Sequence, residues 1–421
     1  MASYMIKGGK RLKGEVEISG SKNAALGIIA ASMLLDGPCT IENVPGIADV
    51  CIMIDICEYL GAEVTREEGG TVKIDPAKLR TCDATNDKAR SIRASYYLMG
   101  ALLGRLGKAI LYMPGGCDFG TRPIDQHLKG FNALGAKHSI EFGKITLTAD
   151  RLTGDHVYFD KVSVGSTVNL MIAAAKAEGV TVIENAAREP HIVDIANFLN
   201  TMGANIKGAG TDVIRITGVR TLPGNSTYAV IPDQIEAGTF MIAAAATTGD
   251  IRITNIIPKH MEPLTAKLEE MGAVIETGDE WIRVYMQRRK RLQATNFMTM
   301  PYPGFPTDLQ PQSTVLLTQA EGTGRMNENV WDNRYQYIDD LKMMGAEVLI
   351  TGRVATVEGP CKLTGARVTA RDLRAGAAMV IAGLAAAGTT EVADVRAIER
   401  GYENFECKLR ALGADISRTE D

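Results

Sequence analysis

The residue whose setting most favours chemistry is Cys117. It lies in the stretch Pro114–Pro123, which contains three glycines and two prolines, and Arg122 follows five residues later. A thiol beside a guanidinium and free backbone amides has a lowered pKa and can serve as an acid or a nucleophile. The glycines would let the stretch move as a lid over a substrate. By composition alone, Cys117 can equally be an incidental loop cysteine.

A second set of candidates is cationic and lies where helices are expected to begin. Lys22, Arg93 and Arg374 each belong to a polar cluster that precedes a run of small apolar residues. Helix N-termini present free N–H groups and a partial positive charge, which suit phosphate and carboxylate ligands. The alternative is that the clusters only cap helices. The six clusters are Ser21–Asn23, Arg90–Arg93, Ser163–Ser166, Asp233–Glu236, Pro306–Asp308 and Asp372–Arg374.

The elements that position these residues are predicted by an internal repeat. A tripeptide of Leu or Met followed by Gly-Ala closes an amphipathic pattern six times, about every 70 residues, which indicates one supersecondary unit in six copies. The glycines of the tripeptides are Gly61, Gly135, Gly203, Gly272, Gly345 and Gly413. Glycine at the end of a helix is typical of a left-handed C-terminal cap.

Within each copy the pattern predicts the order β-α-β-α-β-β, and therefore an α/β protein. The first helix of each unit is so rich in alanine that we expect it to be buried. These helices are predicted over 24–35, 95–106, 167–177, 237–246, 313–319 and 375–387. Three units per half predict two domains, residues 22–231 and residues 1–21 with 232–421, and the anion site is expected in the cleft between them.

Composition excludes several classes of function. A net charge of -4 and an aromatic content of 5% do not suit a nucleic-acid or acidic-membrane partner. The N-terminus has no apolar signal core, and no uninterrupted apolar run approaches the length of a membrane span, so we expect a cytoplasmic protein. Seven cysteines, mostly in apolar stretches, predict buried thiols in a reducing compartment, and five scattered histidines predict no metal site. The basic run 288–291 is expected to be a solvated strand end.

Several strings in order carry a family resemblance over Ile6 to about Ile416. They are Pro114-Gly-Gly-Cys117-Asp-Phe-Gly-Thr-Arg122-Pro-Ile-Asp125-Gln-His127, Ser19-Gly-Ser-Lys22-Asn23, Ile92-Arg93-Ala-Ser, Phe305-Pro-Thr-Asp308, Asn333-Arg334, Asp372-Leu-Arg374 and Arg400-Gly-Tyr. The chain closely resembles the UDP-N-acetylglucosamine 1-carboxyvinyltransferases, a family of enolpyruvyl transferases. The resemblance implies a two-domain inside-out α/β barrel whose halves close on the substrates.

The resemblance also implies the reaction. The enolpyruvyl group of phosphoenolpyruvate would be transferred to the 3'-hydroxyl of UDP-N-acetylglucosamine with release of phosphate, by addition and elimination. This is the first committed step of peptidoglycan synthesis and the target of fosfomycin, and the family uses no metal or organic cofactor. The partners implied are thus two small anionic substrates.

The family's residue roles carry over to matching positions of this sequence. Cys117 would be the acid that protonates the methylene carbon and the site of a covalent adduct with pyruvate, and Asp308 would be the base for the sugar hydroxyl. Lys22, Arg122 and Arg400 would hold phosphoenolpyruvate, with Arg334 and Arg374 as further substrate-binding cations. The sugar nucleotide would contact Asn23, Arg93, Asp308 and Val330. Its uridine and diphosphate would be bordered by Arg122, Pro123, Ile124, Asp125 and Gln126 and by Lys161, Val162, Ser163 and Val164.

Three positions depart from the family pattern. Gln234 replaces a common Arg, Asp332 a Glu, and Glu399 an Asp, and only the first changes charge. Gln234 therefore puts domain closure, or binding near the hinge, in doubt. Three other readings stay open: the sister enzyme that acts on shikimate 3-phosphate, an RNA-end cyclase built from similar units, and a non-catalytic binding protein. The Cys117 stretch argues against the first, and neither a nucleotidyl-accepting His nor a basic surface supports the second.

Overall fold

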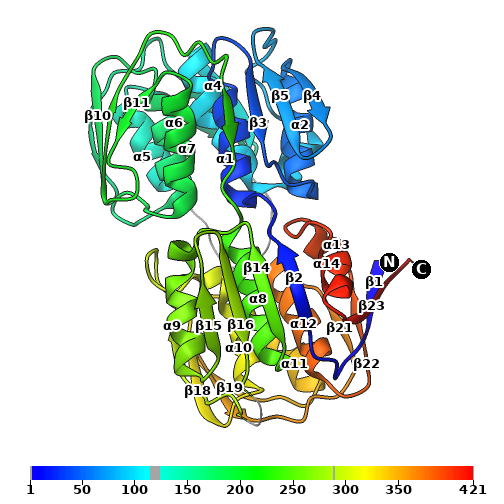
Figure 1. Ribbon diagram of the computed structural model, residues 1–421. Coiled ribbons are helices and arrows are strands. Elements are labelled where there is room, and N and C mark those ends of the chain that lie inside the picture. The colour runs from blue at the N-terminus through cyan, green and yellow to red at the C-terminus, as the bar shows by residue number, and fades with distance from the viewer. Residues whose placement is uncertain (1, 114–123, 288–289, 421) are drawn as a thin grey trace. The chain divides into compact units, whose positions relative to one another are not determined.

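The computed structural model describes residues 2–113, 124–287 and 290–420, and these fall into two compact units, each with its own hydrophobic core (Figure 1). We call residues 20–113 with 124–231 lobe A. Residues 2–19 with 232–287 and 290–420 form lobe B. The opening segment, predicted to belong with residues 232–421, pairs in lobe B, because β1 joins β22 and β23 and β2 joins β14.

Lobe A contains three copies of the repeat. The first consists of α1 (Lys22–Ser32), β3 (Cys39–Glu42), α2 (Ala48–Leu60), β4 (Glu63–Glu67), β5 (Thr71–Asp75) and β13 (Thr227–Ala229). The second consists of α3 (Asp87–Ser91), η1 (Arg93–Tyr97), α4 (Leu98–Leu106), β6 (Lys108–Tyr112), α5 (Asp125–Ala133), β7 (Lys137–Glu141) and β8 (Lys144–Thr148). The third consists of β9 (His156–Tyr158), α6 (Val164–Ala174), β10 (Val180–Glu184), α7 (Pro190–Thr201), β11 (Asn205–Lys207) and β12 (Val213–Thr217).

Lobe B repeats the arrangement. Its first copy consists of β2 (Lys13–Glu17), α8 (Gln234–Ala246), β14 (Asp250–Thr254), η2 (Pro258–Met261), α9 (Glu262–Glu270), β15 (Val274–Thr277) and β16 (Trp281–Tyr285). The second consists of β17 (Asn296–Met298), η3 (Thr307–Leu309), α10 (Gln310–Leu317), β18 (Gly322–Asn327), α11 (Ile338–Met343), β19 (Glu347–Thr351) and β20 (Val354–Gly359). The third consists of β21 (Arg367–Thr369), α12 (Leu373–Ala385), β22 (Thr389–Ala393), α13 (Arg396–Glu399), α14 (Phe405–Ala411), β23 (Asp415–Glu420) and β1 (Ala2–Lys7).

Each repeat forms one mixed sheet, so the described residues contain six sheets. In the sheet of β2, β14, β15 and β16, the first strand runs parallel to the second, and the last two form an antiparallel hairpin. Three other sheets share this order, and in the sheet of β21, β22, β1 and β23 the hairpin is replaced by the antiparallel pair of β1 and β23. In the sheet of β6, β7 and β8 a single parallel bridge between Asp83 and Ile110 stands in for the fourth strand. The predicted order β-α-β-α-β-β is therefore confirmed.

The first helix of each repeat lies in the core of its lobe, as predicted. In α1, ten of eleven residues are buried, in α8 twelve of thirteen, and in α10 all eight. Small residues let neighbouring elements approach closely: a Cβ on Gly27 would lie 2.2 Å from Cδ1 of Ile195. Helices inside and sheets outside give the inside-out arrangement expected of the fold (Figure 1).

The repeated Gly-Ala tripeptide ends the second helix of each unit. All six of its glycines have φ between 89° and 109°, the left-handed conformation predicted for them. The strand ends show a second left-handed position, occupied by Asn43, Asn185, Asn255 and Asp394, with φ between 53° and 58°. The Asn43 side chain donates to the Val230 carbonyl, which ties the two parallel strands of that repeat together.

Some local expectations were wrong. The helix predicted over 95–106 is divided into η1 and α4, and Arg90 lies in the separate helix α3. Of the cysteines that the structure describes, Cys39 and Cys57 are buried as expected, but Cys407 is exposed. Cys407 lies on α14, whose buried residues are Phe405, Glu406 and Leu409, so its side chain falls on the solvent face of the helix.

Candidate active site

In lobe A, the first helix begins at a buried cation. Ser21 caps α1 by accepting a hydrogen bond from the Ala24 N–H, and Lys22 follows it. The chain can approach only because residue 20 is glycine: a Cβ there would lie 1.8 Å from the Asn43 carbonyl oxygen. Lys22 Nζ lies 2.7 Å from Asp49 Oδ2, and both side chains are less than a tenth exposed. The sequence analysis missed Asp49, because nothing in its own segment marks it as a partner of Lys22.

The starts of α5 and α6 lie together, as the predicted nucleotide-bordering segments require. The Gln126 side chain donates to Asp160 Oδ2 at 3.2 Å, and its oxygen accepts from the Asp160 N–H at 2.9 Å. Ser163 caps α6 by accepting from the Ser166 N–H. Ile124 and Asp125 therefore lie beside Lys161, Val162, Ser163 and Val164, of which Lys161 and Val162 are exposed.

A buried histidine connects this edge to Arg93. His127 Nδ1 lies 3.0 Å from the Ser166 hydroxyl, which lies 2.9 Å from that of Ser163. Burial, reinforced by the Arg93 charge, lowers the pKa of His127 to about 4, so its imidazole is neutral at physiological pH. The Arg93 guanidinium lies 5.7 Å from the ring centre of Tyr96, and burial lowers its pKa as well. His127 was noticed only as part of a family string and received no role.

In lobe B, two arginines flank one carboxylate. Arg334 Nη2 lies 3.3 Å from Asp308 Oδ1, and Arg374 Nη2 lies 3.0 Å from Oδ2. The arginine side chains are 2% and 3% exposed, whereas that of Asp308 is 30% exposed. Burial by itself would lower the pKa of Arg374, but Asp308, Tyr402 and Asp233 together raise it above its ordinary value. The guanidinium therefore stays charged, and in this ion cluster two buried arginines share the partly exposed carboxylate of Asp308.

Three helix starts of lobe B contribute to the surroundings of the ion cluster. Arg374 lies in the first turn of α12, which Asp372 caps, and Asp308 lies on η3 directly before α10. Asp233, whose charge acts on Arg374, caps α8. The predicted convergence of polar clusters is confirmed within this lobe. Behind them, the buried Tyr402 hydroxyl lies 3.0 Å from that of Thr239.

The remaining predicted residues lie at the edges of these groups. Asn23 is half-buried in the first turn of α1, and Arg400 is half-buried at the C-terminal end of α13. The Val330 N–H donates to Glu328 Oε1 at 2.8 Å. Cys117, Arg122 and Pro123 lie outside the described residues, and so do the roles predicted for them.

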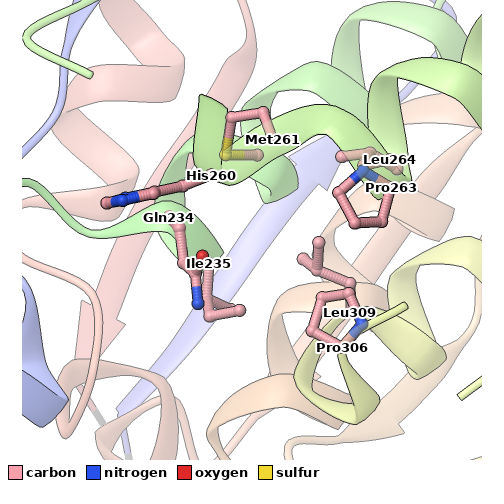
Figure 2. A pocket seen from close by; sticks show the side chains of 8 residues that line it. All are labelled: Gln234, Ile235, His260, Met261, Pro263, Leu264, Pro306 and Leu309. Atoms are coloured by element: carbon pink, nitrogen blue, oxygen red, sulfur yellow. The ribbon is translucent and has the colours of Figure 1, made fainter. Parts of the chain in front are cut away.

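Gln234, the departure from the family pattern, lines a small pocket in lobe B. Figure 2 shows Gln234 and His260 at one end and Pro263 and Pro306 at the other. The empty space is about 200 Å³, open solvent included, which is less than ligand sites usually provide. Since Pro306 belongs to the segment of Asp308, Gln234 contacts the surroundings of the base candidate without forming a substrate site there.

Each group supports a definite chemistry. The ion cluster of lobe B combines two buried guanidiniums with a partly exposed carboxylate, which suits an anion next to a hydroxyl that loses a proton. Lys22 adds a cation at a helix N-terminus in lobe A. Over residues 2–113, 124–287 and 290–420, no group of three or more His, Cys, Asp and Glu side chains is arranged to hold a metal ion.

Comparison with known proteins agrees with this fold and this chemistry. The profile of the EPSP synthase (3-phosphoshikimate 1-carboxyvinyltransferase) family matches residues 6–409, nearly the whole chain. The chain therefore belongs to this family of carboxyvinyl transferases, as the resemblance predicted, and it is an enzyme.

Relatives that share about half of their residues with this chain have a narrower name. UDP-N-acetylglucosamine 1-carboxyvinyltransferase 3 of Caldanaerobacter subterraneus is 54% identical over 421 residues, covering 100% of both chains. UDP-N-acetylglucosamine 1-carboxyvinyltransferase of Clostridium botulinum is 54% identical over 99% of this chain and 100% of its own. Among solved structures, the enolpyruvyl transferase NikO from Streptomyces tendae superimposes with a TM-score of 0.91 at 28% identity, covering 99% of both chains. The EPSP synthase of Acinetobacter baumannii shares the fold at 19% identity, with a TM-score of 0.77 over 100% of both chains.

One general property of the helices bears on location. Among the helices that the structure describes, none combines the length and the apolar character needed to cross a bilayer.

Proposed function

We propose that the chain transfers the enolpyruvyl group of phosphoenolpyruvate to the 3'-hydroxyl of UDP-N-acetylglucosamine and releases phosphate. The observation that carries the proposal is 54% identity over the full chain to relatives named for this activity. The ion cluster of Asp308, Arg334 and Arg374 supports it, because the reaction needs both fixed cations and a proton acceptor. The product begins peptidoglycan synthesis.

The proposed roles balance the reaction's bonds and protons. As the 3'-oxygen bonds to C2 of phosphoenolpyruvate, its proton passes to Asp308, and Cys117 protonates the C3 methylene. Elimination then returns a C3 proton to the Cys117 thiolate and breaks the bond from C2 to the phosphate oxygen, which restores the double bond. The departing phosphate takes up the proton held by Asp308. Cys117 can also hold pyruvate covalently. Neither step requires a metal or an organic cofactor.

Substrate contacts are proposed from the same residues. Phosphoenolpyruvate is held by Lys22, Arg122 and Arg400, whose positive charges oppose those of its carboxylate and phosphate. Arg334 and Arg374 add two further guanidiniums. The sugar nucleotide contacts Asn23, Arg93, Asp308 and Val330, and its diphosphate and uridine are bordered by residues 122–126 and 161–164. Partners are thus small molecules, without nucleic acid or membrane, and we place the enzyme in the cytoplasm.

The decisive experiment offers both acceptors to the purified chain. Phosphate release from phosphoenolpyruvate is measured with UDP-N-acetylglucosamine and, separately, with shikimate 3-phosphate. We expect turnover with the first only. The second acceptor is a real alternative, because the matching family profile is described as 3-phosphoshikimate 1-carboxyvinyltransferase. Turnover with shikimate 3-phosphate alone would replace the proposal by that activity.

A second experiment tests the thiol. Cys117→Ser should lose most turnover, because a hydroxyl is a weaker acid and nucleophile than a thiol. It should also resist inactivation by fosfomycin, an epoxide that alkylates thiols. Inactivation of Cys117→Ser at the wild-type rate would remove Cys117 from the mechanism. Cys407→Ser serves as the control, since Cys407 is an exposed cysteine of lobe B with no proposed role.

A further inference from the structure

Lobe B contains a buried carboxylate that the reaction as proposed does not use. Glu328, just after β18, is 1% exposed. Its Oε1 accepts hydrogen bonds from the Thr299 hydroxyl at 2.8 Å, the Val330 N–H at 2.8 Å and the Trp331 N–H at 3.0 Å. Its Oε2 accepts from the Thr307 hydroxyl at 2.9 Å. All four donors are neutral.

The donors belong to the two segments on which the proposed chemistry depends. Thr307 directly precedes Asp308, the proposed base. Val330 is a proposed sugar-nucleotide contact, and Trp331 follows it. Thr299 completes the connection, because its hydroxyl also accepts from the Asn329 N–H at 2.9 Å. One carboxylate thus joins the segment of the base to the segment that is to receive the acceptor substrate.

We propose that Glu328 is a positioning residue for the transfer reaction, with two separable arms. One arm, from Oε2 to Thr307, sets the direction of the Asp308 carboxylate. The other, from Oε1 to the Val330 and Trp331 amides, shapes the loop that receives the sugar nucleotide. The inference rests on the proposed function, since it assigns each arm to a step of that reaction.

The roles of the two Glu328 oxygens can be tested separately because they accept different numbers of hydrogen bonds. Burying a carboxylate is costly unless its lone pairs are used, and here three donors converge on Oε1 and one on Oε2. A glutamine at this position should therefore place its carbonyl oxygen at the Oε1 site. Its NH2 group then faces Thr307, so the hydroxyl that used to donate must accept instead and point its own hydrogen elsewhere. Glu328→Gln keeps the loop arm and alters the base arm.

The experiment compares steady-state kinetics of three variants with the wild type. Glu328→Ala, which loses both arms, should raise the KM for UDP-N-acetylglucosamine about tenfold and lower kcat about tenfold. Glu328→Gln should restore that KM to within about twofold while kcat stays about fivefold low. Thr307→Val, which removes the base arm alone, should reproduce the glutamine variant. In all three, the KM for phosphoenolpyruvate should stay within about twofold.

A control separates positioning from general destabilisation. Val357→Ala truncates a fully buried side chain on β20, the strand paired with β18, and lowers stability without touching either arm. It should leave kcat and both KM values unchanged. Hydrogen exchange at the Val330 and Trp331 amides adds a readout that needs no substrate: exchange should be slow in the wild type and in Glu328→Gln, and fast in Glu328→Ala.

The outcomes distinguish this inference from the function on which it rests. A wild-type chain that releases no phosphate with UDP-N-acetylglucosamine overturns the proposed function before any variant is compared. If the wild type is active, the positioning role is overturned when Glu328→Gln raises the KM for UDP-N-acetylglucosamine as much as Glu328→Ala does. The same holds if Glu328→Ala changes kcat and KM no more than Val357→Ala.

Discussion

The two lobes treat buried charge differently. In lobe A, the cation Lys22 faces the carboxylate Asp49 at 2.7 Å, and burial keeps His127 neutral. In lobe B, two buried guanidiniums share Asp308, and the Glu328 carboxylate accepts only from neutral donors. Lobe A sets Lys22 against a carboxylate, whereas lobe B gathers two buried guanidiniums around one partly exposed carboxylate, so we expect lobe B to offer the more rigid cationic group to an anionic substrate.

This contrast divides the work of the proposed reaction. The Lys22 ammonium must partly leave Asp49 before it can bind phosphoenolpyruvate. We therefore expect the Lys22 side chain to move when the substrate binds. The arginines of lobe B are held by burial and by Asp308, so they should form a preorganised site. Four changes test this division, from the largest expected effect to the smallest.

Removing the shared carboxylate should have the largest effect. Asp308→Ala removes the proposed base and leaves two buried guanidiniums without their common anion, so kcat should fall about 10²- to 10⁴-fold. Binding of UDP-N-acetylglucosamine should remain measurable by calorimetry. Asp308→Asn, which keeps the shape but not the charge, is the matched comparison and should lose turnover as well, because an amide cannot accept the proton. Turnover of Asp308→Ala near the wild-type rate would remove Asp308 as the base.

Breaking the pair in lobe A should chiefly affect stability. Asp49→Ala leaves the Lys22 ammonium buried with less compensating charge, so the free energy of unfolding should fall by about 3 kcal/mol. Urea denaturation measures the loss. Combining it with Lys22→Met should recover most of the stability, because no buried charge then lacks its partner. If the stability losses of Asp49→Ala and Lys22→Met simply add in the double variant, the two side chains do not stabilise each other and the pairing described for lobe A is wrong.

Replacing a guanidinium by an ammonium tests preorganisation in lobe B. Arg374 reaches Asp308 Oδ2 through both Nε, at 3.2 Å, and Nη2, at 3.0 Å, and a lysine can supply only one such bond. Losing one charge-assisted hydrogen bond corresponds to roughly 2 kcal/mol, so kcat/KM for Arg374→Lys should fall about 30-fold. Lys22→Arg is the counterpart in lobe A. A larger loss there than in Arg374→Lys would reverse the assignment of the rigid site.

The smallest effect concerns pH. The pKa of His127 falls from 6.5 to about 4 on folding because the ring is buried. The unfolded chain therefore binds more protons between these values, and the stability that His127 contributes is present above pH 6.5 and lost as the pH falls toward 4. The loss at pH 5 is about 2 kcal/mol. His127→Asn should flatten the dependence of the urea midpoint on pH between 5 and 7.5; an unchanged slope would contradict it.

Much of the fold was predictable because the repeat marks it six times. A left-handed glycine after a helix and a buried alanine-rich helix are local requirements, so each copy of the sequence expresses them. The division of the helix predicted over 95–106 was not predictable. The sequence pattern does not mark the point where the 3-10 helix ends, whereas in the folded lobe Tyr96 of that helix lies against the His127 ring.

The site was predictable where a family string names the residue, and not where a partner lies far along the chain. Asp308, Arg334 and Arg374 were predicted as members of one site, and the structure places them within hydrogen-bonding distance. Asp49 and Glu328 were missed. Each is an acidic residue in an unremarkable segment, and its importance comes from which groups the tertiary structure brings to it. Sequence periodicity carries no information about such pairs.

The pairing of β1 with β22 and β23, and of β2 with β14, has a consequence for synthesis on the ribosome. Residues 20–231 include all the strands that close lobe A, since β13 returns to pair with β3. The first two strands of the chain, in contrast, have all their partners in the second half, and one partner of β1 is the last strand described. Lobe A can therefore complete its core while translation continues. The strands β1 and β2 stay unpaired until their partners in the second half have been synthesised. A chaperone that binds them before then would compete with their pairing.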